Sequence, residues 1–244
     1  MEEQINGPAN SEVKNNPYTI PGAIIVAGAM VAGAVMYGGG SPNPIPNPSG
    51  QNPVQNQQAG TAVVLSDDLK AFLAEREGDY VFGNPDAPVT ITEFGDFECP
   101  FCSKFHIDTR PQIINKYVKS GQVKILWRHF PLSSIHQFAE PASLAAECAG
   151  EQGKFWEYHD LLFETKKLDG VSLTAHAEAL GLDSGQFKSC VDAGKYLEKI
   201  RGEFNLGRQA GVSGTPSFFI DGELVVGAVP FASIEPIILK ALGE

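Results

Sequence analysis

Two cysteines, Cys99 and Cys102, are separated by only two residues, and this pair limits the possible folds more than any other feature of the sequence. Residues 89–94, just before it, alternate between apolar and polar side chains with a period that is typical of a β-strand, and they end at Gly95. Pro100 follows Cys99 at the position that proline favours as the first residue of a helix, since the N–H that proline lacks would have no partner there. We therefore expect a strand–turn–helix unit with the cysteine pair at the start of the helix.

The expected position of the pair predicts how its thiols react. As the residue before the first helical turn, Cys99 would place its sulfur beside unpaired N–H groups and the positive end of the helix dipole. Both effects favour the thiolate, lower the pKa of the thiol and make Cys99 the nucleophile. Cys102 lies one turn further into the helix and less exposed, where it can resolve a mixed disulfide. We therefore predict a redox-active disulfide between Cys99 and Cys102.

A zinc half-site and a structural disulfide are the alternative interpretations of this pair. A tetrahedral zinc site needs a second pair of ligands at a matching spacing, and the other two cysteines, Cys148 and Cys190, stand singly. The nearest histidine, His106, also stands alone. A disulfide between Cys99 and Cys102 would close a short, strained ring, which stabilises a fold poorly. We therefore expect redox chemistry, with no metal and no other cofactor.

The rest of the chain is expected to form an α/β domain that a block of helices interrupts. The expected strands are 89–94, 123–130, 217–220 and 224–226, and the turn Asp221-Gly222 joins the last two as a hairpin. Helices outside the block are expected at 65–77, at 99–121 with a break near Pro111, and at 231–242. The block itself, at about 134–210, has helical spacing at 142–151, 155–164, 173–180, 186–191 and 196–208.

The first sixty residues differ in composition from the rest of the chain. No charged residue and no histidine occurs from residue 15 to residue 66, and the apolar run at 20–37 would form about 27 Å of helix, close to the hydrocarbon thickness of a bilayer. Prolines at every second position from 42 to 48 then favour an extended spacer. We expect a cytoplasmic N-terminal tail (1–16), a transmembrane signal-anchor (17–40), a linker rich in proline, glutamine and asparagine (41–60) and a folded domain (61–244).

A cleaved signal peptide, followed by secretion, is the alternative to an uncleaved anchor. Small residues at 27–29 and 32–34 would suit a signal peptidase. However, the apolar run starts late, and the tail before it carries three glutamates and a single lysine. An acidic tail of this kind favours the anchor.

Composition supports a globular domain and argues against one class of partner. The apolar fraction of 43% is that of a folded protein. The net charge of −11 makes a surface that repels phosphate backbones, so we expect no nucleic-acid partner.

Several other polar residues receive no part in this chemistry. His129, at the end of the expected strand 123–130, is assigned to capping the turn that follows it, with a substrate contact at the strand end as the alternative. His159 and His176 are expected on helix surfaces. A solvated helix face is expected to carry Glu157, Asp160 and Glu164.

From about residue 82 to the C-terminus, the chain resembles the DsbA-like branch of the thioredoxin superfamily. The resemblance rests on residues 93–98 before the cysteine pair, on the helical block and on residues 211–216, Gly-Val-Ser-Gly-Thr-Pro. It implies an α/β, thioredoxin-like fold with a helical insertion, in which Pro216 is cis and faces the two sulfurs. It also implies that Glu93 is the buried acid that assists proton transfer.

The resemblance implies further roles around the cysteines. Thr215, Pro100 and Phe101 would contact the substrate chain together with Pro216. Phe101 departs from the histidine that the family's strongest oxidant carries at this position, which removes a hydrogen-bond donor and a potential positive charge. The family sometimes carries a structural disulfide in its helical insertion, which favours a bridge between Cys148 and Cys190 over two buried free thiols.

The implied function is that of a membrane-tethered, extracytoplasmic thiol:disulfide oxidoreductase. It would introduce disulfide bonds into unfolded or reduced exported proteins through Cys99 and Cys102, and a membrane quinone-coupled thiol oxidase would reoxidise it. A disulfide reductase or isomerase of the same fold is the alternative within this chemistry. A tethered chaperone, binding through the apolar surface around Phe97, Phe101 and Pro216, is the alternative from a different class.

Overall fold

The computed structural model describes residues 73–244. The expected tail (1–16), membrane span (17–40) and linker (41–60) lie outside the described residues. Among residues 73–244, no helix combines the length and the apolar character that crossing a bilayer requires.

The expected helix at 65–77 also lies mostly outside the described residues, and its expected end is wrong. Leu73 is helical, but residues 74–77 are not. The Thr92 hydroxyl donates a hydrogen bond to the Leu73 carbonyl (2.9 Å), so a side chain of the sheet satisfies a carbonyl where the helix ends. A contact between residues so far apart in the sequence leaves no local signal.

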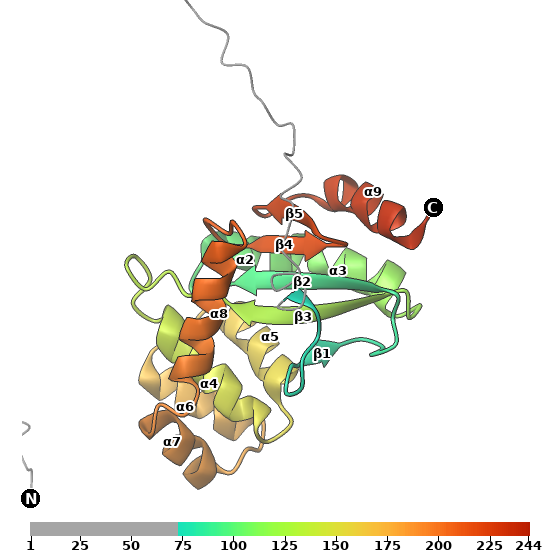
Figure 1. Ribbon diagram of the computed structural model, residues 1–244. Coiled ribbons are helices and arrows are strands. Elements are labelled where there is room, and N and C mark those ends of the chain that lie inside the picture. Colours follow the sequence, from blue (N-terminus) through green and yellow to red (C-terminus); the bar gives the residue numbers. More distant parts are fainter. Residues whose placement is uncertain (1–72) are drawn as a thin grey trace, which may run out of the picture. The chain divides into compact units, whose positions relative to one another are not determined.

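A five-stranded mixed sheet in the order β1-β3-β2-β4-β5 forms the centre of the domain (Figure 1). Its strands are β1 (Val81–Phe82), β2 (Val89–Gly95), β3 (Val123–His129), β4 (Ser217–Ile220) and β5 (Glu223–Val226). β2 and β3 run parallel, whereas the other three pairs are antiparallel. The hairpin from β4 to β5 turns at Asp221 and Gly222, which both have positive φ (48° and 79°), as expected for this tight turn.

Helices cover both faces of this sheet because the side chains of β2 alternate between them. Ile91 packs in one apolar cluster with α2 (Pro100–Asp108), α3 (Arg110–Ile113) and α9 (Phe231–Leu242). Phe94, on the opposite face, lies against α8 (Leu197–Gln209), where Gly207 leaves room for its ring. Figure 1 shows α8 in front of the sheet and α2 and α3 behind it.

The helix after the cysteine pair breaks near Pro111, as expected. α2 ends at Asp108 and α3 begins at Arg110, with Pro111 in its first turn, where proline is tolerated. A short π-helix, η1 (Ile114–Val118), then continues to the loop before β3.

The helical insertion lies between β3 and β4, as the sequence predicts. It consists of α8 and four earlier helices: α4 (Ala139–Gly150), α5 (Phe155–Thr165), α6 (Gly170–Ala179) and α7 (Ser184–Asp192). α6 begins three residues before its expected start because the Asp169 carboxylate caps it, accepting hydrogen bonds from the N–H groups of Val171 and Ser172 (3.1 Å each).

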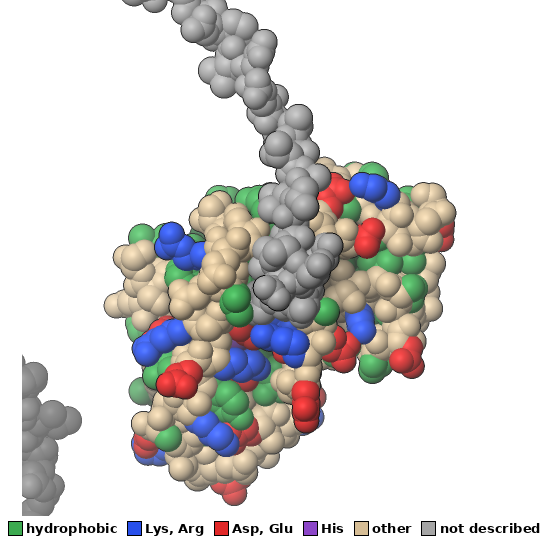
Figure 2. Space-filling view, viewed as in Figure 1, with side chains coloured by type: hydrophobic (Ala, Val, Ile, Leu, Met, Phe, Trp, Pro, Cys, Tyr) green, Lys and Arg blue, Asp and Glu red, His purple; other side chains and the backbone are tan. Residues whose placement is uncertain are grey.

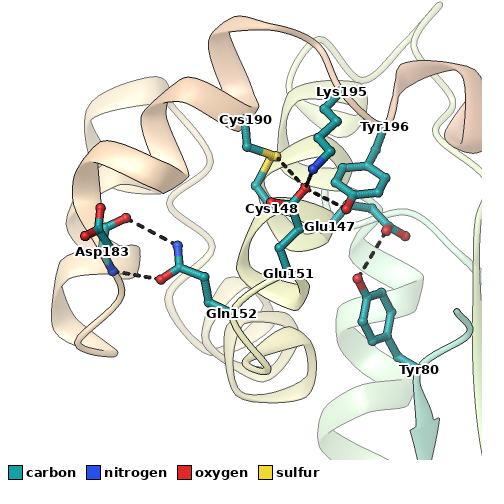
Figure 3. Close-up of a disulfide and its surroundings, with 9 residues drawn as sticks. All are labelled: Tyr80, Glu147, Cys148, Glu151, Gln152, Asp183, Cys190, Lys195 and Tyr196. Atoms are coloured by element: carbon teal, nitrogen blue, oxygen red, sulfur yellow. Dashed lines mark hydrogen bonds and ion pairs between the residues drawn. A yellow bond between two sulfur atoms is a disulfide. The ribbon is translucent and has the colours of Figure 1, made fainter.

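A disulfide joins Cys148 on α4 to Cys190 on α7, with the two Cα atoms 5.8 Å apart (Figure 3). Both cysteines are buried. Beside the bridge, Glu151 accepts a hydrogen bond from the Tyr196 hydroxyl (2.6 Å) and pairs with Lys195. The bridge thus ties two helices of the insertion whose cysteines are 42 residues apart in the sequence.

Removing this bridge is expected to lower the free energy of unfolding of the domain by about 4 kcal/mol, the loop-closure entropy of a loop of this length. The variant is Cys148→Ser/Cys190→Ser, and urea unfolding of the oxidised protein measures the loss. Full reduction of both proteins is the control, and the reduced variant and the reduced wild type should then have the same free energy of unfolding. A free Cys148 thiol, detected by alkylation and mass spectrometry of the oxidised wild type, would contradict this prediction.

Candidate active site

Cys99 and Cys102 lie where β2 leads into α2, at the end of the sheet to which β2 and β3 point (Figure 1). Cys99 occupies the N-cap position of α2, and its N–H donates to the Asp96 carbonyl (3.1 Å). Both cysteines are free thiols in this structure and both are buried, with Cys99 4% exposed and Cys102 inaccessible. The outer and inner positions expected for the two sulfurs are therefore present.

The segment before β4 brings Thr215 and Pro216 to the same place. The peptide bond between them is cis. The Cys99 thiol donates a hydrogen bond to the Thr215 carbonyl, with 3.4 Å between sulfur and oxygen, although the two residues are 116 positions apart. β4 holds this segment in position because Ser217, its first residue, pairs with Phe94 on β2. Three of the expected site residues thus meet at one point.

The two thiols differ strongly in acidity. The pKa of Cys99 is lowered to about 5, first by a hydrogen bond from the Cys102 thiol, against the opposing effect of burial. The Thr215 hydroxyl and the N–H groups of Cys102 and Phe101 make smaller contributions. The pKa of Cys102 is raised well above its usual value, first by burial, then by Cys99 and by the charge of Glu93. At neutral pH, Cys99 is therefore the thiolate, and Cys102 holds the proton.

The cause of the low pKa differs from the one the sequence predicted. The Cys99 side chain makes no regular capping hydrogen bond to the first turn of α2, so the helix N–H groups are not the main contributors. The neighbouring Cys102 thiol has the largest effect instead. The direction of the shift nevertheless agrees with the prediction.

Glu93 lies in the middle of the sheet, on β2, between Trp127 of β3 and Phe218 of β4. It is 3% exposed, and burial raises the pKa of its carboxyl to about 8, while Arg110 lowers it and Asp160 raises it. Glu93 is therefore a neutral carboxylic acid at pH 7. Its charge, once formed, raises the pKa of Cys102, so the protonation of these two groups is coupled.

Pro100 and Phe101 are exposed beside the buried sulfurs. The Phe101 side chain is the more notable, since 59% of it is accessible to solvent. An accessible aromatic ring next to a thiolate offers an apolar contact to an approaching chain. This position suits the substrate contact that the sequence assigns to both residues.

The expectation that His159 and His176 lie on helix surfaces is wrong. His159 is 1% exposed and His176 is 7% exposed. His159 packs against the rings of Trp127 and Phe163, with centroids 4.6 Å and 5.0 Å away. Phe155, His159 and Phe163 recur every four residues, and this spacing could have placed His159 on the buried face of α5.

Asp160 is also more than part of a solvated face. It accepts from Arg110 on α3 (3.1 Å) and from His159 (2.8 Å), whereas Glu157 and Glu164 are exposed as expected. Arg110 is itself 4% exposed, so a buried cation lies at the start of α3.

His129 is a core residue rather than part of a turn. It is inaccessible to solvent; its Nδ1 accepts from the Trp127 indole (3.1 Å), and its Nε2 lies 3.0 Å from the Glu147 carboxylate. β3 ends at His129, one residue earlier than expected, and the Phe130 N–H still donates to the Gly95 carbonyl (2.9 Å) in the parallel ladder that pairs Gly95 with His129.

One group of described residues has the composition of a metal site. Ligand atoms of His106, His159 and Asp160 lie within 4.8 Å of one another, so His106 does not stand alone as the sequence suggested. Burial lowers the pKa of both imidazoles, to about 4 in His106 and about 3 in His159, which leaves them neutral as metal binding requires. The guanidinium of Arg110, 3.1 Å from Asp160, would repel a bound cation.

Comparison with protein families identifies one match, to the thioredoxin family model, over residues 75–240. Two proteins of similar sequence are an antiporter and a disulfide bond formation protein. The Na(+)/H(+) antiporter NhaA 3 of Salinispora tropica is 35% identical over 167 residues, which are 68% of this chain and 25% of the antiporter. The probable disulfide bond formation protein D of Bacillus anthracis is 27% identical over 150 residues, 58% of this chain and 69% of that protein. The chain thus spans about a quarter of the length of the antiporter relatives.

Solved structures show the same fold. BdbD from Bacillus subtilis in its oxidised form is 25% identical, with a TM-score of 0.62 over 68% of this chain and 94% of that one. Alpha-DsbA1 from Wolbachia pipientis is 24% identical, with a TM-score of 0.64 over 71% and 95%. The family match over most of the described residues, the shared fold and the Cys-x-x-Cys pair at the start of α2 agree with one another. The chain therefore belongs to the thioredoxin family, and its fold is that of the DsbA-like members with a helical insertion.

Proposed function

We propose that the protein is an extracytoplasmic thiol:disulfide oxidoreductase that introduces disulfide bonds into exported proteins. The observation that carries this proposal is the unequal acidity of the two thiols: Cys99 with a pKa of about 5 beside Cys102 with a raised pKa. A thiolate of low pKa is a good leaving group, so a mixed disulfide at Cys99 is readily released as an oxidised substrate.

In the proposed reaction, the oxidised protein carries a disulfide between Cys99 and Cys102. A substrate thiolate attacks the Cys99 sulfur, a substrate–Cys99 disulfide forms, and Cys102 leaves as a thiolate that takes up a proton. The second substrate thiolate then attacks the substrate sulfur of this mixed disulfide and expels Cys99 as a thiolate. Two electrons pass from the substrate dithiol to the protein, and the substrate becomes a disulfide.

Glu93 is the proposed source of the proton that Cys102 takes up. Its carboxyl is protonated at pH 7 and coupled to the Cys102 thiol. A neutral acid close to a leaving thiolate can donate a proton as the sulfur becomes negative. Proton transfer in the other direction would occur when Cys102 attacks a disulfide.

The substrate chain is proposed to contact Thr215, Pro216, Pro100 and Phe101. The exposed ring of Phe101 supplies apolar contact area, and the Thr215 carbonyl lies 3.4 Å from the Cys99 sulfur. Contacts of this kind with backbone and a single aromatic ring suit many unfolded sequences rather than one.

The proposed location is the outer side of the membrane, with residues 17–40 as the anchor. The buried Cys148–Cys190 bridge supports an oxidising compartment, because disulfides persist there and are rare in a reducing cytosol. A membrane quinone-coupled thiol oxidase is the proposed electron acceptor.

Acidic and basic side chains intermix on the face seen in Figure 2, and the net charge of −11 gives no support for a nucleic-acid partner.

The test of the proposed function is oxidation of a reduced dithiol peptide by the full chain, with its redox equilibrium measured against glutathione. We expect stoichiometric formation of the peptide disulfide and a potential between the roughly −270 mV of thioredoxin and the roughly −120 mV of DsbA. A potential at or below that of thioredoxin would support a reductase instead. Binding of unfolded chains that persists after both active-site cysteines are replaced, without any oxidation by the wild type, would support a chaperone.

Phe101→His is expected to make the protein a stronger oxidant. A histidine beside Cys99 can supply a hydrogen bond and a positive charge that stabilise the thiolate of the reduced form. The equilibrium with glutathione should shift by about tenfold toward the reduced protein, which is about 30 mV. Phe101→Leu, which keeps an apolar side chain, is the control and should leave the equilibrium unchanged. An unchanged equilibrium in Phe101→His would contradict the prediction.

A further inference from the structure

The loop of residues 130–138, between β3 and α4, is fastened to the segment that precedes Cys99. The Leu132 N–H donates to the Asp96 carboxylate (2.9 Å), and the Phe138 N–H donates to the Glu98 carboxylate (2.6 Å). These bonds join parts of the chain about 40 residues apart. The loop is therefore held against the segment that leads into Cys99.

His136 stands on this loop and shares a support with Cys99. Its Nδ1 lies 2.8 Å from the Asp96 carboxylate, while the Asp96 carbonyl accepts the hydrogen bond from the Cys99 N–H (3.1 Å). Asp96 is inaccessible to solvent and the His136 side chain is 16% exposed. The imidazole is thus held at the rim of the site by a buried carboxylate.

The partner of Nδ1 determines which nitrogen of His136 titrates. A carboxylate accepts hydrogen bonds but does not donate them, so Nδ1 carries a hydrogen whether the ring is charged or neutral. Protonation therefore takes place at Nε2. When Nε2 is protonated, the ring carries a full positive charge, which interacts with the Cys99 thiolate. Phe101 supplies no charge to that thiolate from within the Cys-x-x-Cys motif.

We propose that His136, positioned by Asp96, is the cation that stabilises the Cys99 thiolate. His136 lies on a loop that is distant from Cys99 in the sequence. Its charge would stabilise the thiolate as a charged residue between the two cysteines would. His136 is a positioning residue in this proposal, since it acts through Cys99 and not on the substrate.

The charges that face His136 support this role. Partial burial lowers the pKa of His136, but the hydrogen bond and charge of Asp96, with smaller effects from Cys99 and Glu98, outweigh it and raise the pKa above the usual value. Asp96 and Glu98 belong to the loop after β2, and Cys99 belongs to the start of α2. The raised pKa keeps a larger share of His136 charged near neutral pH than an ordinary histidine would be.

The interaction is expected to weaken the dependence of the redox equilibrium on pH. Reduction of the Cys99–Cys102 disulfide by a substrate dithiol gives the Cys99 thiolate, the Cys102 thiol, the substrate disulfide and one proton. The new thiolate attracts His136, which binds part of a proton on reduction and releases it on reoxidation. A charged His136 therefore stabilises the reduced form. By taking up part of the released proton, it makes substrate oxidation depend less steeply on pH in the range where His136 titrates.

The proposal rests on the proposed function of Cys99 as the attacking thiolate, but its test does not require enzymatic activity. The Cys99 pKa is measured in the reduced full chain from the ultraviolet absorbance of the thiolate. His136→Asn should raise this pKa by about one unit, which is a tenfold weaker acid. His136→Lys restores a positive charge, so its Cys99 pKa should lie close to that of the wild type. Lys104→Gln, which removes an exposed charge from α2, is the matched control and should change nothing.

A second measurement avoids substitution altogether. The His136 pKa of the wild type, followed by NMR, should be higher in the reduced protein than in the oxidised one, because only the reduced protein carries the thiolate. An unchanged Cys99 pKa in a folded His136→Asn variant, or equal His136 pKa values in the two redox states, would overturn the proposal. If both pKa effects are observed but the protein fails to oxidise the peptide, the result would count against the proposed function and not against the role of His136.

Discussion

Cys99→Ser is expected to abolish thiol exchange, whereas Cys102→Ser is expected to accumulate substrate trapped as a mixed disulfide. The reason is the division of roles between the sulfurs: Cys99 is the thiolate that forms the bond to substrate, and Cys102 holds the proton and resolves that bond. Serine at position 99 offers no thiolate near neutral pH, so the first step fails. Incubation with a peptide that carries a disulfide, which the Cys99 thiolate attacks with release of one peptide thiolate, followed by electrophoresis without reductant, measures the trapped species.

Two variants at position 102 test the origin of the acidity of Cys99. Its pKa of about 5 depends most on the hydrogen bond from the Cys102 thiol. Serine keeps a hydrogen-bond donor at position 102, whereas Cys102→Ala removes it, so the pKa of Cys99 should rise further in the alanine variant. Cys148→Ser/Cys190→Ser, with the active-site pair intact, is the control for loss of cysteines and should still exchange thiols. Trapping by Cys99→Ser instead of Cys102→Ser would reverse the assignment of the two roles.

The sequence predicts the elements that carry a strong local signal. The alternation at 89–94 and the proline after Cys99 suffice to place β2 and the start of α2, because both signals lie within a few residues. The five helices of the insertion are found for the same reason. β1, with only Val81 and Phe82, is too short to show a period and was not predicted.

The environment of the site is less accessible to prediction because it depends on contacts between distant residues. Asp96 and His136 are 40 positions apart, and nothing in either neighbourhood indicates their hydrogen bond. Arg110 and Asp160 likewise meet only because α3 and α5 pack at the same end of the domain. The resemblance supplies the role of Glu93, whereas the size of its pKa shift follows from its burial in the centre of the sheet.

Glu93 should also make the stability of the domain depend on pH. The pKa of Glu93 is about 8 in the folded protein, whereas its ordinary value, which applies to the unfolded chain, is 4.5. Between pH 4.5 and pH 8, the folded protein therefore binds a proton that the unfolded chain has lost. The contribution to stability is complete below pH 4.5 and is lost as the pH rises to 8, because the unfolded chain ionises while the buried carboxyl cannot. At 1.36 kcal/mol for each unit, the loss amounts to about 5 kcal/mol.

Glu93→Gln is therefore expected to make the protein more stable at pH 8 by about 5 kcal/mol while changing its stability little at pH 4.5. Glutamine has the shape of the protonated acid but no proton to lose. Urea unfolding of the oxidised protein isolates the effect, because neither Cys99 nor Cys102 titrates as a disulfide. Glu157→Gln, on an exposed face of α5, is the control and should follow the wild type at both pH values.

The gain in stability should come with a loss of proton transfer. An amide cannot donate a proton to Cys102 as it leaves, so the first exchange step should slow by about a hundredfold, the lower end of what general acid catalysis supplies. The wild-type rate should fall as Glu93 ionises near pH 8, and this decline should be absent from Glu93→Gln. Stopped-flow mixing with a reduced peptide across pH 6 to 9 measures both. If Glu93→Gln is more stable at pH 8 but performs the first exchange step as fast as the wild type, Glu93 affects stability and not proton transfer. Cys102 would then take its proton from solvent.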